Sequence, residues 1–250
     1  FSIGTREQVI YNSPKGVSMC GIVGYIGNKD ALPILIEGLR RLEYRGYDSV
    51  GIAIIPKDKI VIKKCKGKIK DLESSLKGKK ISESHIGISH NRWATHGAPT
   101  NINAHPHQDC SGGIAVVHNG IIENFSELKK QLIEEGHKFK SQTDTEVISH
   151  LVEKYYKGDL KDAVLSSLKN LKGSFALGVI SRNEPDRIIA ARKESPLIIG
   201  IGERENFIAS DVPAILKYTK KVIYLEDGEI AVLTKDKVEV FDSEGALRHK

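Results

Sequence analysis

The sequence predicts an α+β protein in which antiparallel sheets are layered with helices. Short apolar segments separated by polar turns are numerous, segments with helical periodicity are few, and the two kinds do not alternate regularly. A regular alternation would instead favour a parallel sheet with crossover helices. The 250 residues contain no internal repeat and no linker rich in Pro, Gly or Ser, so we expect one domain.

The first predicted strand is the apolar segment 20–27, CGIVGYIG. A helix follows it, because Asn28 or Asp30 can cap a helix and Pro33 suits a first turn. The apolar residues of this helix recur at the three- and four-residue spacing of one helical face: Leu32, Leu35, Ile36, Leu39 and Leu42.

The rest of the chain continues the pattern of short strands and amphipathic helices. Strands are predicted at 50–55 and 59–64, joined by a turn at 56–58, and further apolar runs occupy 85–90 and 114–118. Helical periodicity marks the segments 124–135, 144–156 and 159–171. The C-terminal part is rich in strands, at 174–181, 187–192, 197–201, 206–210, 221–225, 229–233 and 238–241.

The composition is that of a globular protein, with 40% hydrophobic and 28% charged residues. It excludes a disordered, collagen-like or low-complexity chain. No apolar run reaches the roughly 18 residues of a membrane span, so we expect no membrane partner. Residues 1–17 do not form a secretory signal, because they carry Arg6, Glu7 and Lys15 and lack an apolar core.

The charge balance gives no sign of a nucleic-acid partner. The 38 basic and 32 acidic residues give a net charge of +6, a modest excess that favours solubility. The densest basic stretch, 63–80, is interrupted by Asp71 and Glu73 and has no interleaved aromatic residues. We interpret this stretch as a solvated face.

The cysteines indicate a reducing environment. Cys20, Cys65 and Cys110 are too widely and irregularly spaced for a disulfide framework, which favours a cytoplasmic location. The lysines around Cys65 could lower the pKa of its thiol. A strand-edge cysteine beside solvated lysines is the preferred interpretation.

The sequence predicts no metal site and no cofactor. Histidines cluster around Cys110, but their spacing matches no established ligand pattern and no Cys-x-x-Cys occurs; they are His96, His105, His107 and His118. Gly200 and Gly202 lack the third glycine of a dinucleotide fingerprint, and no phosphate-binding loop is present.

The start of the chain bears on its chemistry. Phe1 is not a translation start, and the single methionine, Met19, directly precedes Cys20. We expect Met19 to be the natural initiator and 1–18 to be an upstream extension or a removable propeptide, so that the domain covers 19–250. An ordinary N-terminal arm is the alternative.

Removal of Met19 would place the α-amino group of the chain on Cys20. An α-amine has a pKa of about 7.7–8.0, so it can take the proton of the neighbouring thiol near neutral pH. One residue would then supply both nucleophile and general base. The alternative is a cysteine that acts only as a small buried residue in a strand.

Polar loops next to buried strands supply further candidates. Asn119 and Gly120 can donate hydrogen bonds to an oxyanion, although Asn-Gly is also a common turn. Arg92, beside the single tryptophan Trp93, can bind a carboxylate with its planar guanidinium. Asp144 can pair with an ammonium group or act only as the cap of the following helix.

Several segments together resemble the glutaminase domain of glutamine–fructose-6-phosphate aminotransferases, also called glucosamine-6-phosphate synthases. The resemblance runs from Met19 almost to the end of the chain. It is carried by the segments MCGIVG (19–24), LRRLEYRGYDS (39–49), RWATHG (92–97), NAHPH (103–107), VHNGIIEN (117–124) and TDTE (143–146). Related class II amidotransferases, such as amidophosphoribosyltransferase, asparagine synthetase and glutamate synthase, share the Cys-Gly-Ile start but are less similar in the second and third segments.

The resemblance implies an N-terminal-nucleophile hydrolase fold, a four-layer αββα sandwich of two antiparallel sheets. It implies that Cys20 is the nucleophile that forms a γ-glutamyl thioester with L-glutamine, and that Asn119 and Gly120 form the oxyanion hole. Arg92 would bind the glutamine carboxylate and Asp144 its α-amine. The loop that closes over glutamine would contain Trp93, Thr95 and His96.

The sequence departs from this family in two ways. Eighteen residues precede Met19, so the chain as written has an amide in place of the amine base and would be an unprocessed or inactive form. The family also continues into two sugar-phosphate-binding domains, through which we expect homo-oligomers to form, and the chain stops before them. The alternatives are therefore a glutaminase domain of another class II amidotransferase, or a non-catalytic glutamine-binding module with a blocked Cys20.

Overall fold

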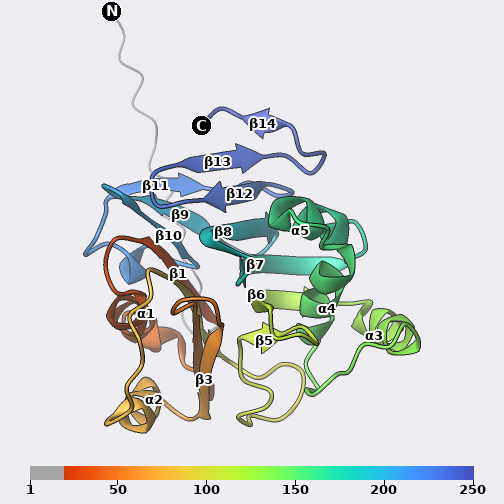
Figure 1. Cartoon of the computed structure of the whole chain (residues 1–250), viewed down its shortest axis with the longest axis horizontal. Coiled ribbons are helices and arrows are strands. Elements are labelled where there is room, and N and C mark those ends of the chain that lie inside the picture. The colour runs from red at the N-terminus through yellow and green to blue at the C-terminus, as the bar shows by residue number, and fades with distance from the viewer. Residues whose placement is uncertain (1–19) are drawn as a thin grey trace, which may run out of the picture.

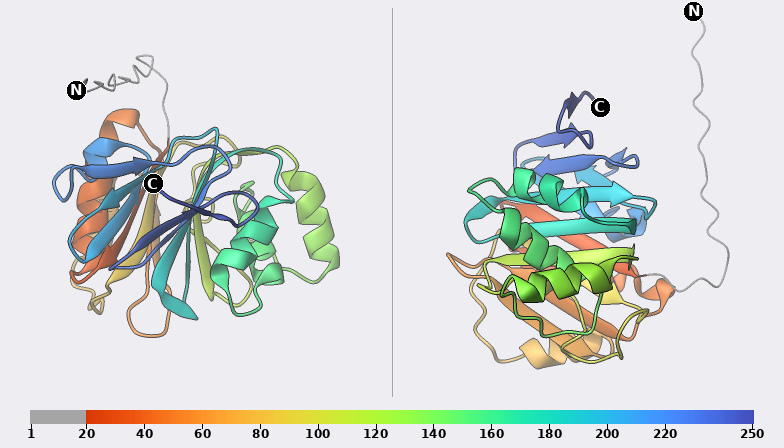
Figure 2. Two further views of the ribbon diagram at one scale, coloured as in Figure 1. Left: turned by 90° about the horizontal axis from the view of Figure 1, so that it is seen from above. Right: turned by 90° about the vertical axis from the view of Figure 1, so that its right-hand side faces the viewer.

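Two antiparallel sheets pack face to face between two layers of helices (Figures 1 and 2). The computed structural model describes residues 20–250, so the predictions for 1–18 and Met19 lie outside the described residues. The predicted α+β class with four αββα layers is confirmed. Within 20–250, none of the helices has the length and apolar composition that a membrane crossing requires.

The first sheet contains the strand that begins beside Cys20. Its strand order is β11-β9-β10-β1-β4-β2-β3, and every neighbouring pair is antiparallel. The strands are β1 (Gly21–Gly27), β2 (Ser49–Ile54), β3 (Val61–Lys66), β4 (Ile86–Arg92), β9 (Ile198–Ile201), β10 (Glu205–Ala209) and β11 (Lys221–Tyr224).

The second sheet contains the strand that carries Asn119. Its order is β14-β13-β12-β8-β7-β6-β5, again antiparallel throughout. The strands are β5 (His107–Gln108), β6 (Ile114–Ile122), β7 (Gly173–Ser181), β8 (Glu184–Lys193), β12 (Ile230–Leu233), β13 (Val238–Phe241) and β14 (Leu247–Arg248).

Helices cover the outer face of each sheet. On the first sheet lie α1 (Ala31–Arg40), which is capped by the Asp30 side chain, and α2 (Ile69–Leu76). On the second lie α3 (Phe125–Glu134), α4 (Glu146–Tyr155) and α5 (Leu160–Leu168). Figure 2 shows the two helical layers on opposite sides of the paired sheets.

The two sheets approach each other closely along the middle of the sandwich. Gly24 in β1 and Gly178 in β7 both leave room for Ile208, because a Cβ at either position would lie 2.6 Å from its side chain. Ile88 and Val117 pack in the same layer between the sheets. This close packing brings the ends of β1, β4 and β6 together, which is where the predicted site residues lie.

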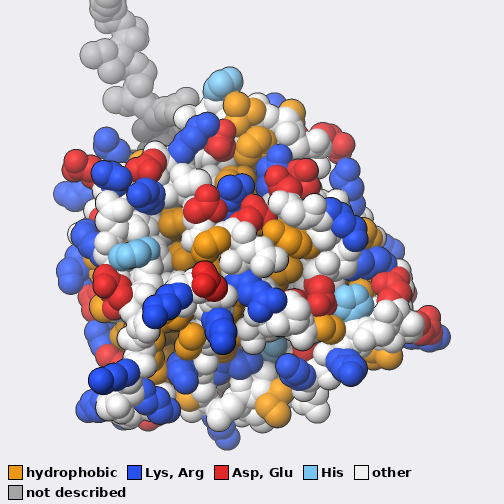
Figure 3. Space-filling view, viewed as in Figure 1, with side chains coloured by type: hydrophobic (Ala, Val, Ile, Leu, Met, Phe, Trp, Pro, Cys, Tyr) orange, Lys and Arg blue, Asp and Glu red, His pale blue; other side chains and the backbone are white. Residues whose placement is uncertain are grey.

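Sequence periodicity missed parts of the fold. The stretch 63–80, predicted to be only a solvated face, contains α2, whose Ile69 and Leu72 are buried. Lys64 is also half-buried; burial lowers its pKa to about 8, and its Nζ donates to the carbonyls of Ile102 and Pro106. Most other lysines of the stretch are exposed, and Figure 3 shows basic and acidic groups interspersed over one face of the molecule.

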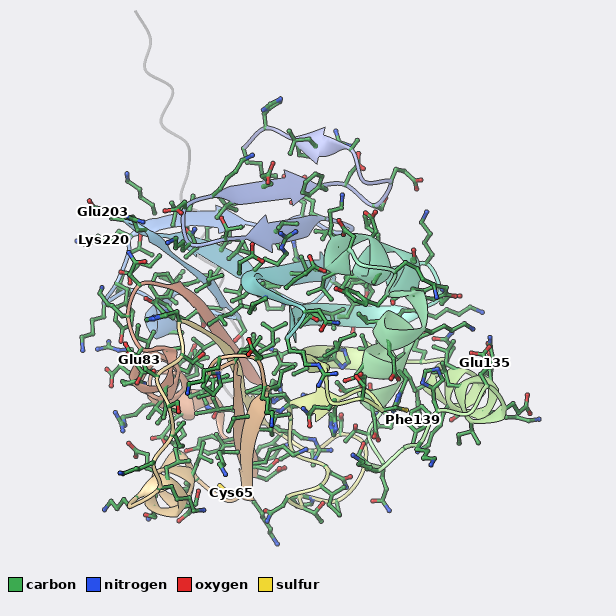
Figure 4. All side chains as sticks on the ribbon, viewed as in Figure 1. Cys65, Glu83, Glu135, Phe139, Glu203 and Lys220 are labelled. Carbon is green, nitrogen blue, oxygen red and sulfur yellow. The ribbon has the colours of Figure 1, made fainter. Side chains whose placement is uncertain are left out.

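Cys65 lies on β3, which is the edge strand of the first sheet, as predicted (Figure 4). Burial and the nearby Asp71 carboxylate raise the pKa of its thiol to about 11. The interpretation of Cys65 as an unreactive edge cysteine is therefore favoured over a lysine-activated thiol.

Candidate active site

A cavity of about 270 Å³ opens where the start of β1 meets the ends of β4 and β6. Gly21 pairs with Asn91 across the first sheet, which places Cys20 beside Arg92. Of the predicted site residues, the cavity lining includes Cys20, Arg92, Trp93, Thr95, Asn119, Gly120 and Asp144. It also includes residues to which the sequence assigned no part in substrate binding, namely His105, His118, Ile121, Thr145, Ser174, Ser195 and Pro196.

Cys20 directly precedes β1 and is half-buried. The Trp93 backbone N–H donates to its Sγ at 3.1 Å, and the Sγ lies 3.5 Å from the Trp93 carbonyl oxygen. Burial raises the pKa of the thiol above its ordinary value, and the N–H donor and the Arg92 charge oppose this only in part. The thiol therefore needs a base before it can act as a nucleophile at neutral pH.

The Asn119 side chain is held with its amino group toward Cys20. Its Nδ2 donates to the Cys20 carbonyl at 3.1 Å, so its Oδ1 faces the other way and accepts from His90 Nε2 at 2.8 Å. His90 is fully buried, and burial lowers its pKa to about 3, so the ring is neutral and donates through Nε2. The His90 ring stacks on His105 with centroids 4.2 Å apart.

Gly120 follows Asn119 where no larger residue fits. Its φ is +122°, and a Cβ would lie 2.2 Å from the Ser174 carbonyl oxygen on β7. The backbone can therefore come close to a ligand at this point only because residue 120 is glycine.

Arg92 is 3% exposed and shapes the adjacent loop. Its Nη2 donates to the carbonyls of His96 and Gly97, the latter at 3.0 Å. Its Nη1 is buried and has no hydrogen-bond partner among residues 20–250. A buried guanidinium nitrogen without a partner is suited to an incoming carboxylate.

His96 holds the loop to Arg92 through its backbone, because its carbonyl oxygen accepts a hydrogen bond from the Arg92 guanidinium. Its ring packs edge-on against Phe125, with centroids 5.2 Å apart, and is not part of the cavity lining. Trp93 is 44% exposed at the cavity rim. The loop is tied down further by Asp48, whose Oδ2 accepts from the Ala94 N–H at 2.7 Å, a role that the sequence did not reveal.

Asp144 is buried against the cavity, and its Oδ2 accepts from the Ile122 N–H of β6 at 2.9 Å. Thr145 occupies the N-cap position of α4, without a side-chain capping hydrogen bond, so the alternative that Asp144 is the helix cap is wrong. The carboxylate is instead tied to the strand that carries Asn119 and lies close enough to influence both Cys20 and Arg92 electrostatically.

His118 supports the floor of the cavity. Its Nδ1 is 2.9 Å from the Thr145 hydroxyl, and its Nε2 is 3.4 Å from the Ser174 carbonyl oxygen. Because Nε2 must donate to that carbonyl, Nδ1 accepts from the hydroxyl. Burial lowers the pKa of His118, so the ring is neutral with both nitrogens engaged.

The two-sheet sandwich with a cysteine at the start of its central strand defines the class of N-terminal-nucleophile hydrolases. The structure of glutamine phosphoribosylpyrophosphate amidotransferase from B. subtilis matches 92% of this chain and 50% of its own, with a TM-score of 0.78 and 27% identity. Residues 90–217, more than half of the chain, match the glutamine amidotransferase domain family. The chain belongs to this family.

Similar sequences point to one branch of the family. The glutamine–fructose-6-phosphate aminotransferase (isomerizing) of Aquifex aeolicus is 59% identical over 91% of this chain, and that of Pyrococcus horikoshii is 55% identical over 87%. The chain covers 38% and 37% of these relatives. It therefore spans well under half the length of the curated relatives that it matches.

Proposed function

We propose that this domain hydrolyses L-glutamine to glutamate and ammonia through a γ-glutamyl thioester on Cys20. One observation carries the proposal: Cys20, Asn119, Arg92 and Asp144, which offer a thiol, an amide, a guanidinium and a carboxylate, line one cavity. The two charged groups match the α-carboxylate and α-ammonium of an amino acid, and the thiol and amide match the chemistry of its carboxamide.

The reaction begins when the Cys20 sulfur attacks the carboxamide carbon and the thiol proton passes to a base. Asn119 Nδ2 and the Gly120 N–H stabilise the oxyanion that forms. The C–N bond then breaks, and the nitrogen leaves as ammonia with the transferred proton. Water hydrolyses the thioester to glutamate and restores the thiol. The base is the α-amine of Cys20, once this residue is the first of the chain.

Substrate selection rests on the two ends of the amino acid. Arg92 Nη1 binds the carboxylate and Asp144 binds the ammonium, while Trp93, Thr95 and His96 belong to a loop that closes over glutamine. The anchoring of this loop to Arg92 supports such a role, because Arg92 borders the cavity, and Asp48 fixes the loop further through the Ala94 N–H.

In the longer protein, the ammonia aminates fructose 6-phosphate to glucosamine 6-phosphate. This step uses C-terminal sugar-phosphate-binding domains, through which the protein forms homo-oligomers. The names and lengths of the relatives support this assignment. The three widely spaced cysteines support a cytoplasmic location.

The test of the nucleophile uses three versions of a chain that begins at Met19. Glutamate release should be abolished by Cys20→Ala and largely retained in Cys65→Ala, because Cys65 does not line the cavity and its pKa is raised to about 11. Peptide mass mapping after treatment with an electrophilic glutamine analogue should find the label on Cys20. Loss of activity in a folded Cys65→Ala variant would contradict the assignment.

A second comparison tests the base. The chain that begins at Phe1 should release little glutamate, because an amide nitrogen cannot accept the thiol proton, whereas the chain that begins at Met19 should lose that residue and be active. Both N-termini are verified by mass. Equal rates from an intact Phe1 form would defeat the amine-base mechanism. Glutamine binding without hydrolysis by both forms would instead favour a non-catalytic binding module.

A further inference from the structure

A second group of reactive side chains lies away from the cavity, where the β5–β6 turn, the end of α3 and the outer part of α4 meet. Cys110 is in the turn, His137 follows α3, and His150 and Glu153 are one turn apart on α4. One ligand atom from each of the four lies within 4.8 Å of all the others. The group is reached from the surface, because Cys110 is exposed and only His150 is fully buried.

The distances from the Cys110 sulfur to the two histidines match the spacing of ligands around a tetrahedral zinc ion. Cys110 Sγ lies 3.5 Å from His150 Nδ1 and 3.7 Å from His137 Nδ1. Bonds of about 2.3 Å to sulfur and about 2.0–2.1 Å to nitrogen at tetrahedral angles place these atoms about 3.6 Å apart. Glu153 Oε2 is the fourth candidate ligand: it lies at hydrogen-bond distance, 2.9 Å, from His137 Nδ1 and 3.5 Å from His150 Nδ1.

We propose that Cys110, His137, His150 and Glu153 form a structural zinc site. A thiolate, two imidazoles and one carboxylate suit Zn²⁺, whereas Ca²⁺ and Mg²⁺ prefer oxygen ligands. Because all four positions come from the protein, the site is closed, which is typical of structural rather than catalytic zinc. The sequence predicted no metal site, and this proposal departs from that prediction.

The surroundings of His150 support the proposal independently. The side chain is 1% exposed, and its Nε2 has no hydrogen-bond partner within 20–250 but lies 3.8 Å from Glu146 Oε1. Zinc-bound histidines commonly present their second nitrogen to a carboxylate. Glu146 is held in place by the backbone N–H groups of Lys140 and Ser141, at 2.8 and 2.6 Å.

A ring from the segment between α3 and α4 closes one side of the group. Phe139, labelled in Figure 4, lies 4.3 Å from the His150 ring, centroid to centroid. A zinc ion bound to Cys110, His137 and the two side chains of α4 would join three segments of the chain.

The zinc site would affect the cavity only indirectly, through helix α4. α4 begins directly after Asp144 and Thr145, which border the cavity, and carries His150 and Glu153 farther along. Zinc would fix α4 against the β5–β6 turn and so stabilise the cavity wall without contacting substrate. The main readouts are therefore metal binding and stability, which do not depend on the glutaminase proposal.

The test uses Co²⁺ as a spectroscopic substitute for zinc, because a bound thiolate gives a charge-transfer band and a tetrahedral site gives intense d–d bands. The full 250-residue chain, treated with chelator and exchanged into metal-free buffer, should bind one equivalent with both features. Among the three cysteine variants, only Cys110→Ser should lose the charge-transfer band; Cys20→Ser and Cys65→Ser should keep it. His137→Ala should weaken binding at least tenfold, and the exposed His85→Ala serves as its matched control.

Stability gives a second readout. Zinc should raise the melting temperature of the native chain and of Cys65→Ser, but not of Cys110→Ser, since only a ligand that binds the folded state stabilises it. Circular dichroism confirms that each apo variant is folded. Absence of stoichiometric Co²⁺ binding would overturn the proposal, as would a charge-transfer band that survives Cys110→Ser and disappears in Cys20→Ser.

Discussion

The reactivity of individual groups in the cavity is set by their neighbours. Burial raises the pKa of the Cys20 thiol, which makes activation by a base necessary. The neutral His90 ring orients the Asn119 amide, which frees its amino group to face Cys20. The second effect is a contact between the two sheets, because His90 lies on β4 and Asn119 on β6.

The first prediction at this scale concerns the oxyanion. Asn119→Ala should lower kcat for glutamine hydrolysis by about 10²–10³ with little change in KM, because its donor acts mainly in the transition state. His90→Phe, which keeps a ring but removes the donor to Asn119, should lower kcat by a smaller factor. Steady-state kinetics of both variants check this. An effect confined to KM would exclude the oxyanion role.

The second prediction concerns the two ends of glutamine. Asp144→Asn keeps an acceptor for the Ile122 N–H but loses its charge, so KM should rise about ten- to a hundredfold, the value of a charge-assisted hydrogen bond. Arg92→Met should raise KM at least as much. The exposed Asp186→Asn is the control. An unchanged KM in Asp144→Asn would remove Asp144 from substrate binding.

At the scale of elements, the ends of strands position the chemistry. β1 and β4 are antiparallel neighbours, so Gly21 at the start of β1 pairs with Asn91 near the end of β4. β6 reaches the same point from the second sheet and pairs with β7, where Gly120 lies opposite Phe175. The cavity therefore depends on tight contact between strands.

The close approach of β6 and β7 at Gly120 predicts that a larger residue at this position destabilises the fold. Gly120→Ala should lower the free energy of unfolding by at least about 2 kcal/mol, because the new Cβ would meet the Ser174 carbonyl and the backbone φ is +122°. Gly136→Ala is the matched control, with a φ of +99° but no atom within 4 Å, and should cost about 1 kcal/mol. Urea unfolding distinguishes the two. Equal losses would show that φ alone matters.

Helices and strands were predictable from the sequence where the spacing of apolar residues matches the face that the structure buries. Strand β13 has the predicted limits, and the Asp30 cap of α1 was one of two candidates. Helix α2 was missed because only Ile69 and Leu72 are buried in a lysine-rich stretch. The two-residue strands β5 and β14 were missed because pairing with neighbours, and not sequence pattern, defines them.

At the scale of the whole molecule, the packing of the sheets buries four histidines around the cavity. Burial lowers the pKa of His90 to about 3, lowers that of His105 and His107 well below the ordinary value, and also lowers that of His118. These rings are neutral in the folded chain and gain protons on unfolding below about pH 6.5. Their contribution to stability is therefore present above pH 6.5 and is lost as the pH falls toward 3.

The free energy of unfolding should consequently decrease by a few kcal/mol between pH 7 and pH 5, with uptake of more than one proton. Urea unfolding at a series of pH values measures this slope. His85→Ala should leave the slope unchanged, because His85 is exposed. A free energy of unfolding that is constant between pH 7 and pH 5 would contradict the prediction.

The sequence by itself determined the α+β class, most strand and helix positions, and the residues around the cavity, because periodicity and polar loops next to buried strands are local features. The sequence did not show how each of these residues contributes: His96 accepts a hydrogen bond from Arg92 through its backbone carbonyl, and its ring takes no part. Only the tertiary structure decided that His90 orients Asn119, that Asp144 binds β6 instead of capping α4, and that Cys110 meets His137, His150 and Glu153. These contacts join residues far apart in the chain, and they depend on strand order and sheet packing, which no local pattern encodes.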